Sequence, residues 1–259
     1  TTFVGFLLGT IDIRFTNMRK IPSILFFYLI TYGQIELPEY STDEIIIENT
    51  GYTVSFNEAH LQPNWVAYEL TKSEALGSLP RKNNFQVDPQ IHDKTALPTD
   101  YKGTNFDRGH LAPAADMAWS KAAMEESFYM SNISPQHYSF NRGIWKKLEN
   151  LVRKWAIEYG SVYIVTAGVL DEGLNQTGNR KNISIPENYF KVILDYQEPG
   201  LKAIGFLLPN KKINQSLMDY IFTVDDIERI TGINFFHILQ DDIEERLESK
   251  TNPEMWIWE

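Results

Sequence analysis

Cysteine is absent from the 259 residues of this chain. Its absence excludes disulfides, thiolate metal sites and cysteine nucleophiles. It does not reveal the compartment, because a domain of this length needs no disulfide even in an oxidising space. The sequence also has no internal repeat, low-complexity tract or linker, so one domain is the simplest organisation.

Basic residues are scarce, and the formal net charge is −10. This balance argues against a protein that holds nucleic acid by bulk electrostatics. The charge is uneven, however. Residues 34–75 hold eight acids and one base, whereas residues 80–154 hold eleven bases and eight acids. A polyanionic substrate that is held briefly and released is compatible with this distribution, and a long-lived complex is less so.

Apolar material is plentiful, since 43% of the residues are hydrophobic. That amount supports a sizeable core and excludes an intrinsically disordered chain. A hairpin is expected from residues 52–57 and 65–70, and a loop from 77–104. Further strands are expected at 127–133, 162–167, 189–196 and 203–208, with helices at 141–159, 225–231 and in the acidic tail. We predict an α+β fold with a mixed or antiparallel central sheet and flanking helices.

The N-terminal segment predicts export. Met18 opens a short basic region, residues 21–32 form an apolar run too short for a comfortable membrane span, and small residues follow. A buried strand or helix is the alternative. On the favoured interpretation, residues 1–33 are an extension plus signal peptide, with Met18 as the true start. Residues 34–259 are then a single exported domain.

The most specific motif is the segment TNFDRGHLAPAADM, which contains Asp107, Arg108, Gly109 and His110. Each of these residues could instead have a purely structural role. Asp107 and Arg108 suit a structural ion pair, Gly109 suits a turn, and a lone histidine is more often structural than catalytic. Residue types alone therefore leave both interpretations open.

The helix expected from Asn141 begins about thirty residues later. Its apolar stripe at helical spacing comprises Ile144, Trp145, Leu148, Leu151, Val152 and Trp155. Asn141 is expected to cap the helix, and Glu149 to lie two turns on, on the side of Arg142, Lys146 and Arg153. A plain amphipathic helix with a solvated basic face is the alternative.

These residue types match the needs of phosphodiester hydrolysis. A neutral histidine accepts a proton from water, and an arginine donates to phosphate oxygens. An asparagine oxygen suits a hard divalent ion, while a carboxylate orients metal-bound water. His110, Arg108, Asn141 and Glu149 supply one of each.

The spacing of DRGH, SNISPQ and NRGIWKKLE resembles the DNA/RNA non-specific endonuclease family of the ββα-metal superfamily. The resemblance is close through residues 104–150 and looser over about 50–240. It implies a ββα-metal finger made of strands near 106–111 and 129–133 and the helix from Asn141.

The resemblance also implies a role for each site residue. His110 would be the general base, Asn141 the direct Mg²⁺ ligand and Glu149 a holder of metal-bound water. Arg108 and Asn132 would contact phosphate or support the site, and Arg142 is placed with the substrate-binding residues. Arg81 resembles, more loosely, an arginine that stabilises the transition state. Asp107 is expected to be structural.

The leading hypothesis is an exported, Mg²⁺-dependent endonuclease that cuts DNA and RNA to 5′-phosphate products and contacts the phosphate backbone. Mn²⁺ or another divalent ion is an alternative cofactor, and a homodimer is compatible with the sequence. A catalytically silent nucleic-acid-binding protein of the same fold and a phosphodiesterase for another phosphorylated substrate are the competing hypotheses.

Overall fold

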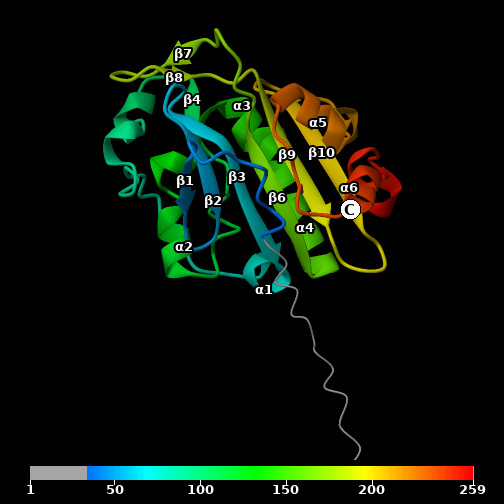
Figure 1. Ribbon diagram of the computed structural model, residues 1–259. Coiled ribbons are helices and arrows are strands. Elements are labelled where there is room, and N and C mark those ends of the chain that lie inside the picture. The colour runs from blue at the N-terminus through cyan, green and yellow to red at the C-terminus, as the bar shows by residue number, and fades with distance from the viewer. Residues whose placement is uncertain (1–33, 259) are drawn as a thin grey trace, which may run out of the picture. The chain divides into compact units, whose positions relative to one another are not determined.

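The computed structural model describes residues 34–258, and its centre is a seven-stranded sheet (Figure 1). The strand order is β1-β2-β3-β6-β9-β10-β11, and every neighbouring pair is antiparallel. The strands are β1 Ile45–Glu48, β2 Thr53–Asn57, β3 Gln62–Thr71, β6 Ser161–Gly168, β9 Asn188–Asp195, β10 Lys202–Pro209 and β11 Ile221–Phe222. The predicted α+β class with an antiparallel central sheet is confirmed.

Two small sheets accompany the central one within residues 34–258. The first pairs β4, Phe106–His110, with β5, Ile133–His137, in antiparallel register. The second pairs β7, Gln176–Thr177, with β8, Ile183–Ser184. Since β4 carries the DRGH motif, that motif lies on a strand.

The apolar, β-branched segments of the chain form the middle of the central sheet. The expected hairpin is present as β2 and β3, with a bulge between Ser55 and Phe56. The segments expected at 162–167, 189–196 and 203–208 form β6, β9 and β10, each within two residues of its expected bounds. These three strands are buried over most of their length because elements cover both faces of the sheet.

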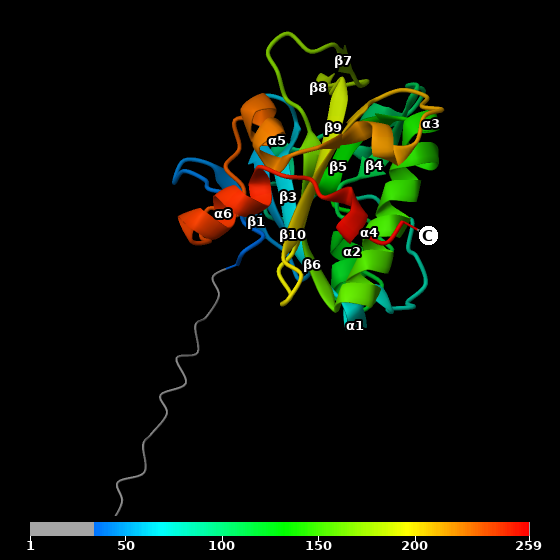
Figure 2. The ribbon, with the colours of Figure 1, turned by 90° about the vertical axis from the view of Figure 1, so that its right-hand side faces the viewer.

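Helices pack on opposite faces of the sheet, as Figure 2 shows. The β4–β5 pair and α4 lie on one side, and α5 and α6 lie on the other. The α-helices are α1 Lys72–Ala75, α2 Lys121–Glu126, α3 Tyr138–Phe140, α4 Lys146–Tyr159, α5 Val224–Thr231 and α6 Asp241–Glu248. Shorter 3-10 turns are η1 His92–Lys94, η2 Pro98–Tyr101, η3 Met130–Asn132, η5 Leu217–Tyr220 and η6 Pro253–Met255.

The predicted apolar stripe anchors α4 against the sheet. Ile144, Trp145, Leu148, Val152 and Trp155 are buried, and Leu151 is partly buried. The helix ends at Tyr159, and Gly160 follows with a φ of +97°, a backbone conformation that favours glycine. The C-terminal apolar end packs on the same helix, where Trp155 donates from Nε1 to the carbonyl of Ile257 at 2.6 Å.

The strand expected at residues 127–133 is not present. The chain leaves α2 at Ser127 and forms the 3-10 turn Met130–Asn132, and the strand begins only at Ile133. The side chain of Asn132 explains the difference. Its Nδ2 donates to the carbonyls of Ala112 and Ser127, both at 2.9 Å, so backbone groups that a strand would pair are bound by a side chain.

Asn141 does not cap its helix, contrary to the sequence expectation. The helical run starts at Tyr138, and His137 occupies the cap position, where its Nδ1 accepts from the backbone of Ser139 at 3.3 Å. Asn141 opens η4, the π-helical turn Asn141–Trp145 between α3 and α4. Such turns are rare inside helices and are frequent at functional sites, because they displace one side chain from the regular spacing.

The expected signal peptide lies in residues 1–33, outside the described part of the chain. From residue 34 to 258, no helix is long and apolar enough to cross a membrane.

Candidate active site

A cleft of about 430 Å³ lies between β4 and the first turns of α4. Five cationic side chains and one carboxylate line it, so the cleft is strongly basic although the whole chain has a net charge of −10. The lining residues are Arg81, Arg108, His110, Pro113, Ala114, Ala115, Asn141, Arg142, Lys146, Glu149, Asn150 and Arg153. The structure therefore brings six of the seven predicted site residues to one cleft; Asn132 is the exception.

His110 reaches the cleft from the end of β4 and is 7% exposed. Its ring packs against Phe85 and Phe128, with ring centroids 5.3 and 4.8 Å away. Burial, together with the nearby charges of Arg81 and Arg108, lowers the pKa of His110 to about 3, although a hydrogen bond to the backbone of Arg108 opposes this shift. The imidazole is therefore neutral near pH 7.

The two ring nitrogens of His110 have different surroundings. Nε2 is buried and has no hydrogen-bond partner within the described residues. The hydrogen bond to the backbone of Arg108 then belongs to Nδ1, which fixes the tautomer with the lone pair on Nε2. An unshared lone pair on a neutral imidazole is the group that a general base requires.

Gly109 is needed for packing inside a strand and not for a turn. It pairs with Ser134 in the β4–β5 register. A Cβ atom at this position would lie 2.3 Å from the side chain of Gln136, which is itself buried. Glycine therefore allows β5 to lie close to the strand that carries His110.

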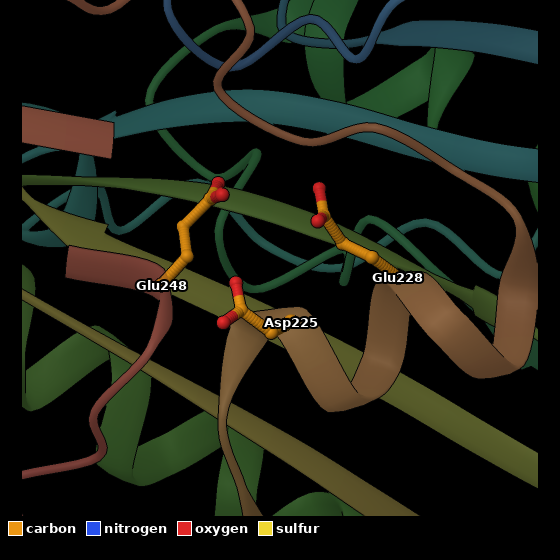
Figure 3. A group of neighbouring side chains, drawn as sticks. All are labelled: Asp225, Glu228 and Glu248. Carbon is orange, nitrogen blue, oxygen red and sulfur yellow. The ribbon is translucent and has the colours of Figure 1, made fainter. Parts of the chain in front are cut away.

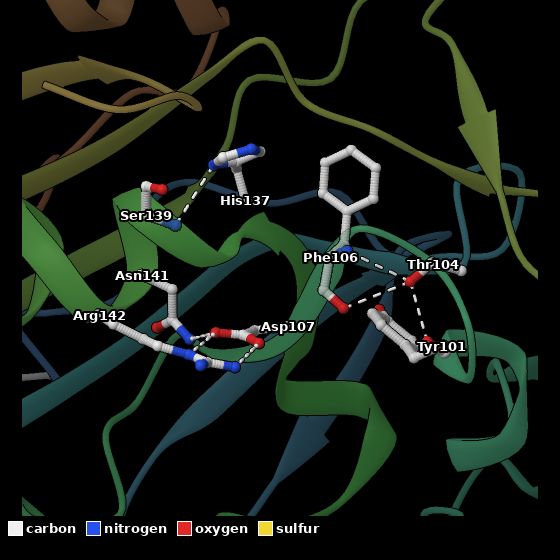
Figure 4. Close-up of polar contacts among 8 residues, drawn as sticks. All are labelled: Tyr101, Thr104, Phe106, Asp107, His137, Ser139, Asn141 and Arg142. Atoms are coloured by element: carbon white, nitrogen blue, oxygen red, sulfur yellow. Dashed lines mark hydrogen bonds and ion pairs between the residues drawn. The ribbon is translucent and has the colours of Figure 1, made fainter.

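Asp107 orients Asn141, as Figure 4 shows. The Oδ2 atom of Asp107 accepts from Nδ2 of Asn141 at 2.9 Å. The same carboxylate forms a two-pronged ion pair with Arg142, at 2.8 Å to Nε and 2.6 Å to Nη2. Because the amide nitrogen of Asn141 is committed to Asp107, its Oδ1 is the atom left for a ligand in the cleft. Arg142 is 72% exposed on the rim.

Glu149 lies two turns farther along, on the floor of the cleft and partly exposed. Desolvation raises its pKa above the ordinary value, and the charge of Lys191 opposes the shift. Lys191 projects from β9, is 1% exposed, and has no hydrogen-bond partner for Nζ within residues 34–258. Its Nζ lies 5.0 Å from the ring centroid of Trp145. A buried cation thus supports the ionised form of Glu149.

A second buried group adjoins Glu149. Asp116, 1% exposed, forms an ion pair with Arg153 and accepts from the hydroxyl of Tyr68 at 2.9 Å. Arg153 also donates to Oδ1 of Asn150 at 2.7 Å. These contacts hold the cleft wall formed by α4, and they leave Asp116 with both oxygens engaged.

Arg81 and Arg108 point into the cleft without an acidic partner. Neither forms an ion pair within 4.0 Å among the described residues. The guanidinium carbon of Arg108 lies 4.1 Å from the ring centroid of Phe85, and that of Arg81 lies 5.1 Å from that of Phe128. The aromatic rings therefore support two guanidinium groups that retain donors for an anion.

Asn132 lies outside the cleft and is completely buried. Its amide oxygen accepts from the backbone of Ala112 at 2.9 Å, and its amide nitrogen donates to two carbonyls. Of the two roles that the family resemblance implies, support of the site fits this burial and substrate contact does not. The role of Asn132 in the site stays a prediction, and its contacts favour the positioning of the segment after His110.

Sequence reasoning placed Arg153 on the helix side of Glu149 but gave it no role in the site, and it assigned no role there to Lys191 or Asp116. Lys191 had a readable signal, since a lysine inside the apolar strand NYFKVILD is unusual. Arg153 lies four residues after Glu149 and so shares its helix face. Asp116 had no such signal, because only the tertiary fold brings it to Arg153 and Tyr68.

Comparison with known proteins gives a consistent picture. The sequence model of the DNA/RNA non-specific endonuclease family matches residues 32–242. A protein of Danio rerio named "Nuclease EXOG, mitochondrial" is 32% identical over 224 residues, which cover 80% of this chain and 65% of that protein. The chain thus spans slightly less than two thirds of that relative.

A bacterial relative and a solved structure extend the likeness. The protein named "Nuclease" of Serratia marcescens is 33% identical over 223 residues, covering 82% of this chain and 83% of that protein. The crystal structure titled as the EndoG/EndoGI complex contains a chain with a TM-score of 0.73 and 26% identity. That match covers 80% of this chain and 90% of the other.

Proposed function

This chain belongs to the DNA/RNA non-specific endonuclease family, and we propose that it is a metal-dependent endonuclease that hydrolyses phosphodiester bonds of DNA and RNA. One observation carries the proposal. The unpartnered Nε2 of His110 shares a basic cleft with the free Oδ1 of Asn141 and the carboxylate of Glu149. The nuclease names of the relatives support the substrate class.

His110 is the proposed general base, and its surroundings suggest how it is activated. In the free protein, burial is the largest cause of the lowered pKa of His110, and the charges of Arg81 and Arg108 add to it. A phosphodiester anion bound between these arginines would offset their charges and raise that pKa. The imidazole would therefore become a stronger base when substrate is in place.

Arg81 and Arg108 are the proposed phosphate-binding and transition-state-stabilising groups. Their guanidinium groups have no acidic partner among the described residues and so can donate to the non-bridging oxygens. Arg142 lies on the rim and is paired with Asp107, and we propose that it contacts the adjacent phosphate backbone of the nucleic-acid substrate. Contacts with the backbone alone would give little sequence preference.

The donor set fits a hard divalent ion such as Mg²⁺, with Mn²⁺ as the alternative. Asn141 would hold the ion directly through Oδ1, and Glu149 would hold its water. When bound, the ion supplies neutralisation of the charge that develops on the phosphate and the departing oxygen. We further propose 5′-phosphate and 3′-hydroxyl products, as the family resemblance implies.

Residues 34–259 are proposed to act as one nuclease domain, exported after removal of residues 1–33. A homodimer is compatible with this proposal. A silent nucleic-acid-binding protein would need only the basic cleft. The additional presence of His110, Asn141 and Glu149 in that cleft favours hydrolysis.

Digestion of plasmid DNA and of RNA by purified residues 34–259 tests the function. We expect degradation with Mg²⁺ and none with chelator. The variant His110→Ala should lose about 10²–10⁴-fold in rate, which is the usual contribution of a general base. His92→Ala, at an exposed histidine outside the cleft, is the matched control and should retain activity.

Three results would contradict parts of the proposal. Full activity of the His110→Ala variant would reject His110 as the base. DNA that is retained in a gel shift with Mg²⁺ but never cut would indicate a binding protein. Turnover of a small chromogenic diester without any polynucleotide cleavage would indicate another phosphodiester substrate.

A further inference from the structure

Three carboxylates converge between α5 and α6 (Figure 3). Asp225 and Glu228 lie three residues apart on α5 and therefore on one face of that helix. Glu248 is the last residue of α6. One ligand oxygen from each residue lies within 4.8 Å of the others.

These acids differ in burial but share a lack of cationic partners. Glu248 is 4% exposed, and its Oε1 has no hydrogen-bond partner within residues 34–258. Glu228 is partly buried and accepts from the backbone of Phe235 at 2.7 Å. Asp225 is exposed at the mouth of the cluster. In the described part of the chain no lysine, arginine or histidine lies within 4.0 Å of any of the three carboxylates.

Three neighbouring carboxylates without a cationic partner favour the binding of a cation. The nearest arginine in sequence, Arg229, is paired with Asp226 instead. An unpartnered carboxylate oxygen in a buried position is costly unless a ligand satisfies it.

We propose that Asp225, Glu228 and Glu248 form a Ca²⁺ site, the α5–α6 carboxylate site, that ties α6 to α5. The ligands are all oxygen atoms, which suits a hard ion and not zinc, whose sites favour histidine and cysteine. Oxygens on opposite sides of one Ca²⁺ are about 4.6–5.2 Å apart, since each Ca–O distance is about 2.3–2.6 Å. The upper limit of 4.8 Å between these ligand atoms is compatible with that span.

The α5–α6 carboxylate site is separate from the basic cleft. It lies on the side of the sheet opposite to α4, as Figure 2 shows. Glu248 also lies beyond residues 32–242, the segment that the family model matches. The bound ion would therefore stabilise the C-terminal part of the chain and would not take part in hydrolysis.

Calcium titration of chelator-treated protein tests this site, in the Asn141→Ala background so that the proposed catalytic metal ligand is absent. We expect one Ca²⁺ per chain by isothermal titration calorimetry. At a Ca²⁺ concentration about 100-fold above Kd, Tm should rise by about 5–10 °C. The substitution Glu248→Gln, introduced into the same Asn141→Ala background, should weaken Ca²⁺ binding by at least about 10-fold, because it removes the charge of the buried ligand.

Two further variants keep the test decisive. Asp242→Asn removes an exposed acid of the same helix that is outside the cluster, and it should leave the Ca²⁺ affinity unchanged. If Glu248→Gln fails to fold, Asp225→Asn changes an exposed ligand instead and should also weaken binding. The proposal is overturned if Ca²⁺ up to about 10 mM gives neither heat nor a Tm shift. It is equally overturned if both ligand variants bind Ca²⁺ as the parent does.

Discussion

The basic cleft and the α5–α6 carboxylate site gather charges of opposite sign in one chain. The cleft gathers five cationic side chains around one carboxylate, whereas the other site gathers three carboxylates without a cation. They lie on opposite sides of the central sheet. In each, buried polar atoms lack partners, namely Nε2 of His110 and Oε1 of Glu248.

The difference between the two sites teaches that net charge alone is a poor guide to ligands. A chain with a formal charge of −10 builds a cleft suited to a polyanion, because five cationic side chains and one carboxylate line that cleft. Beside the cleft, Asp107 pairs with Arg142 and Asp116 pairs with Arg153, whereas Arg81 and Arg108 have no ion-pair partner among the described residues. Local pairing therefore decides which charges remain available to a ligand.

The largest expected effect separates the two sites directly. Asn141→Ala should reduce Mg²⁺-dependent nuclease activity by more than about 100-fold, since even the outer partners of metal ligands contribute about 10–100-fold. Glu248→Gln should leave that activity within about twofold at 25 °C. Rates on plasmid DNA check both variants. If Glu248→Gln lost activity as severely as Asn141→Ala, the two sites would not be independent.

The next effect concerns how Asn141 is held in the cleft. Asp107→Ala removes the acceptor for Nδ2 of Asn141 and the partner of Arg142. We expect a loss of about 10–100-fold in kcat and a higher Mg²⁺ requirement, because the ligand amide is free to rotate. The control is Asp171→Ala, at an exposed acid outside the cleft. An unchanged Mg²⁺ requirement would show that Asp107 does not position Asn141.

A smaller effect follows from the unpaired arginines. Arg108→Ala should raise KM by about 10-fold at moderate salt and reduce the salt slope of DNA binding by about 1, as loss of one phosphate contact does. Arg180→Ala, an exposed arginine outside the cleft, should change neither. Binding measured from 50 to 200 mM salt checks the slope. A slope equal to that of the parent would exclude Arg108 as a phosphate contact.

The smallest effect concerns Lys191 and the pH profile. Its positive charge lowers the pKa of Glu149, so Lys191→Met should raise that pKa. Because the ionised form of Glu149 is the proposed working form, activity on the acidic side should then require a higher pH, with a loss of a few-fold near pH 7. Lys202→Met is the matched control, since Lys202 is also buried but pairs with Asp195. If the acidic side of the pH–activity profile did not shift in Lys191→Met, the proposed role of Lys191 would be contradicted.

The sequence predicted the bounds of helices and strands correctly where local patterns, such as apolar runs and terminating glycines, agreed with the tertiary contacts. The bounds of β6, β9 and β10 follow from apolar runs, and the ends of α4 and α5 follow from Gly160 and Gly232. The interpretation of residues 127–133 as a strand was wrong because Asn132 binds the backbone of segments twenty and five residues away. The cap role of Asn141 was wrong because the helical run starts at Tyr138 and His137 is its cap residue.

Local patterns in the sequence were enough to predict the fold class and the apolar face of α4, and they show the resemblance of the segments with His110, Asn141 and Glu149 to one family. These follow from periodicity and motif spacing, which are local properties of the chain. Only the tertiary structure decided that Asp107 orients Asn141, that Lys191 lies beside Glu149 and that Glu248 meets Asp225. Each of these relations joins residues from separate elements, and only the tertiary packing of those elements sets their distance and burial.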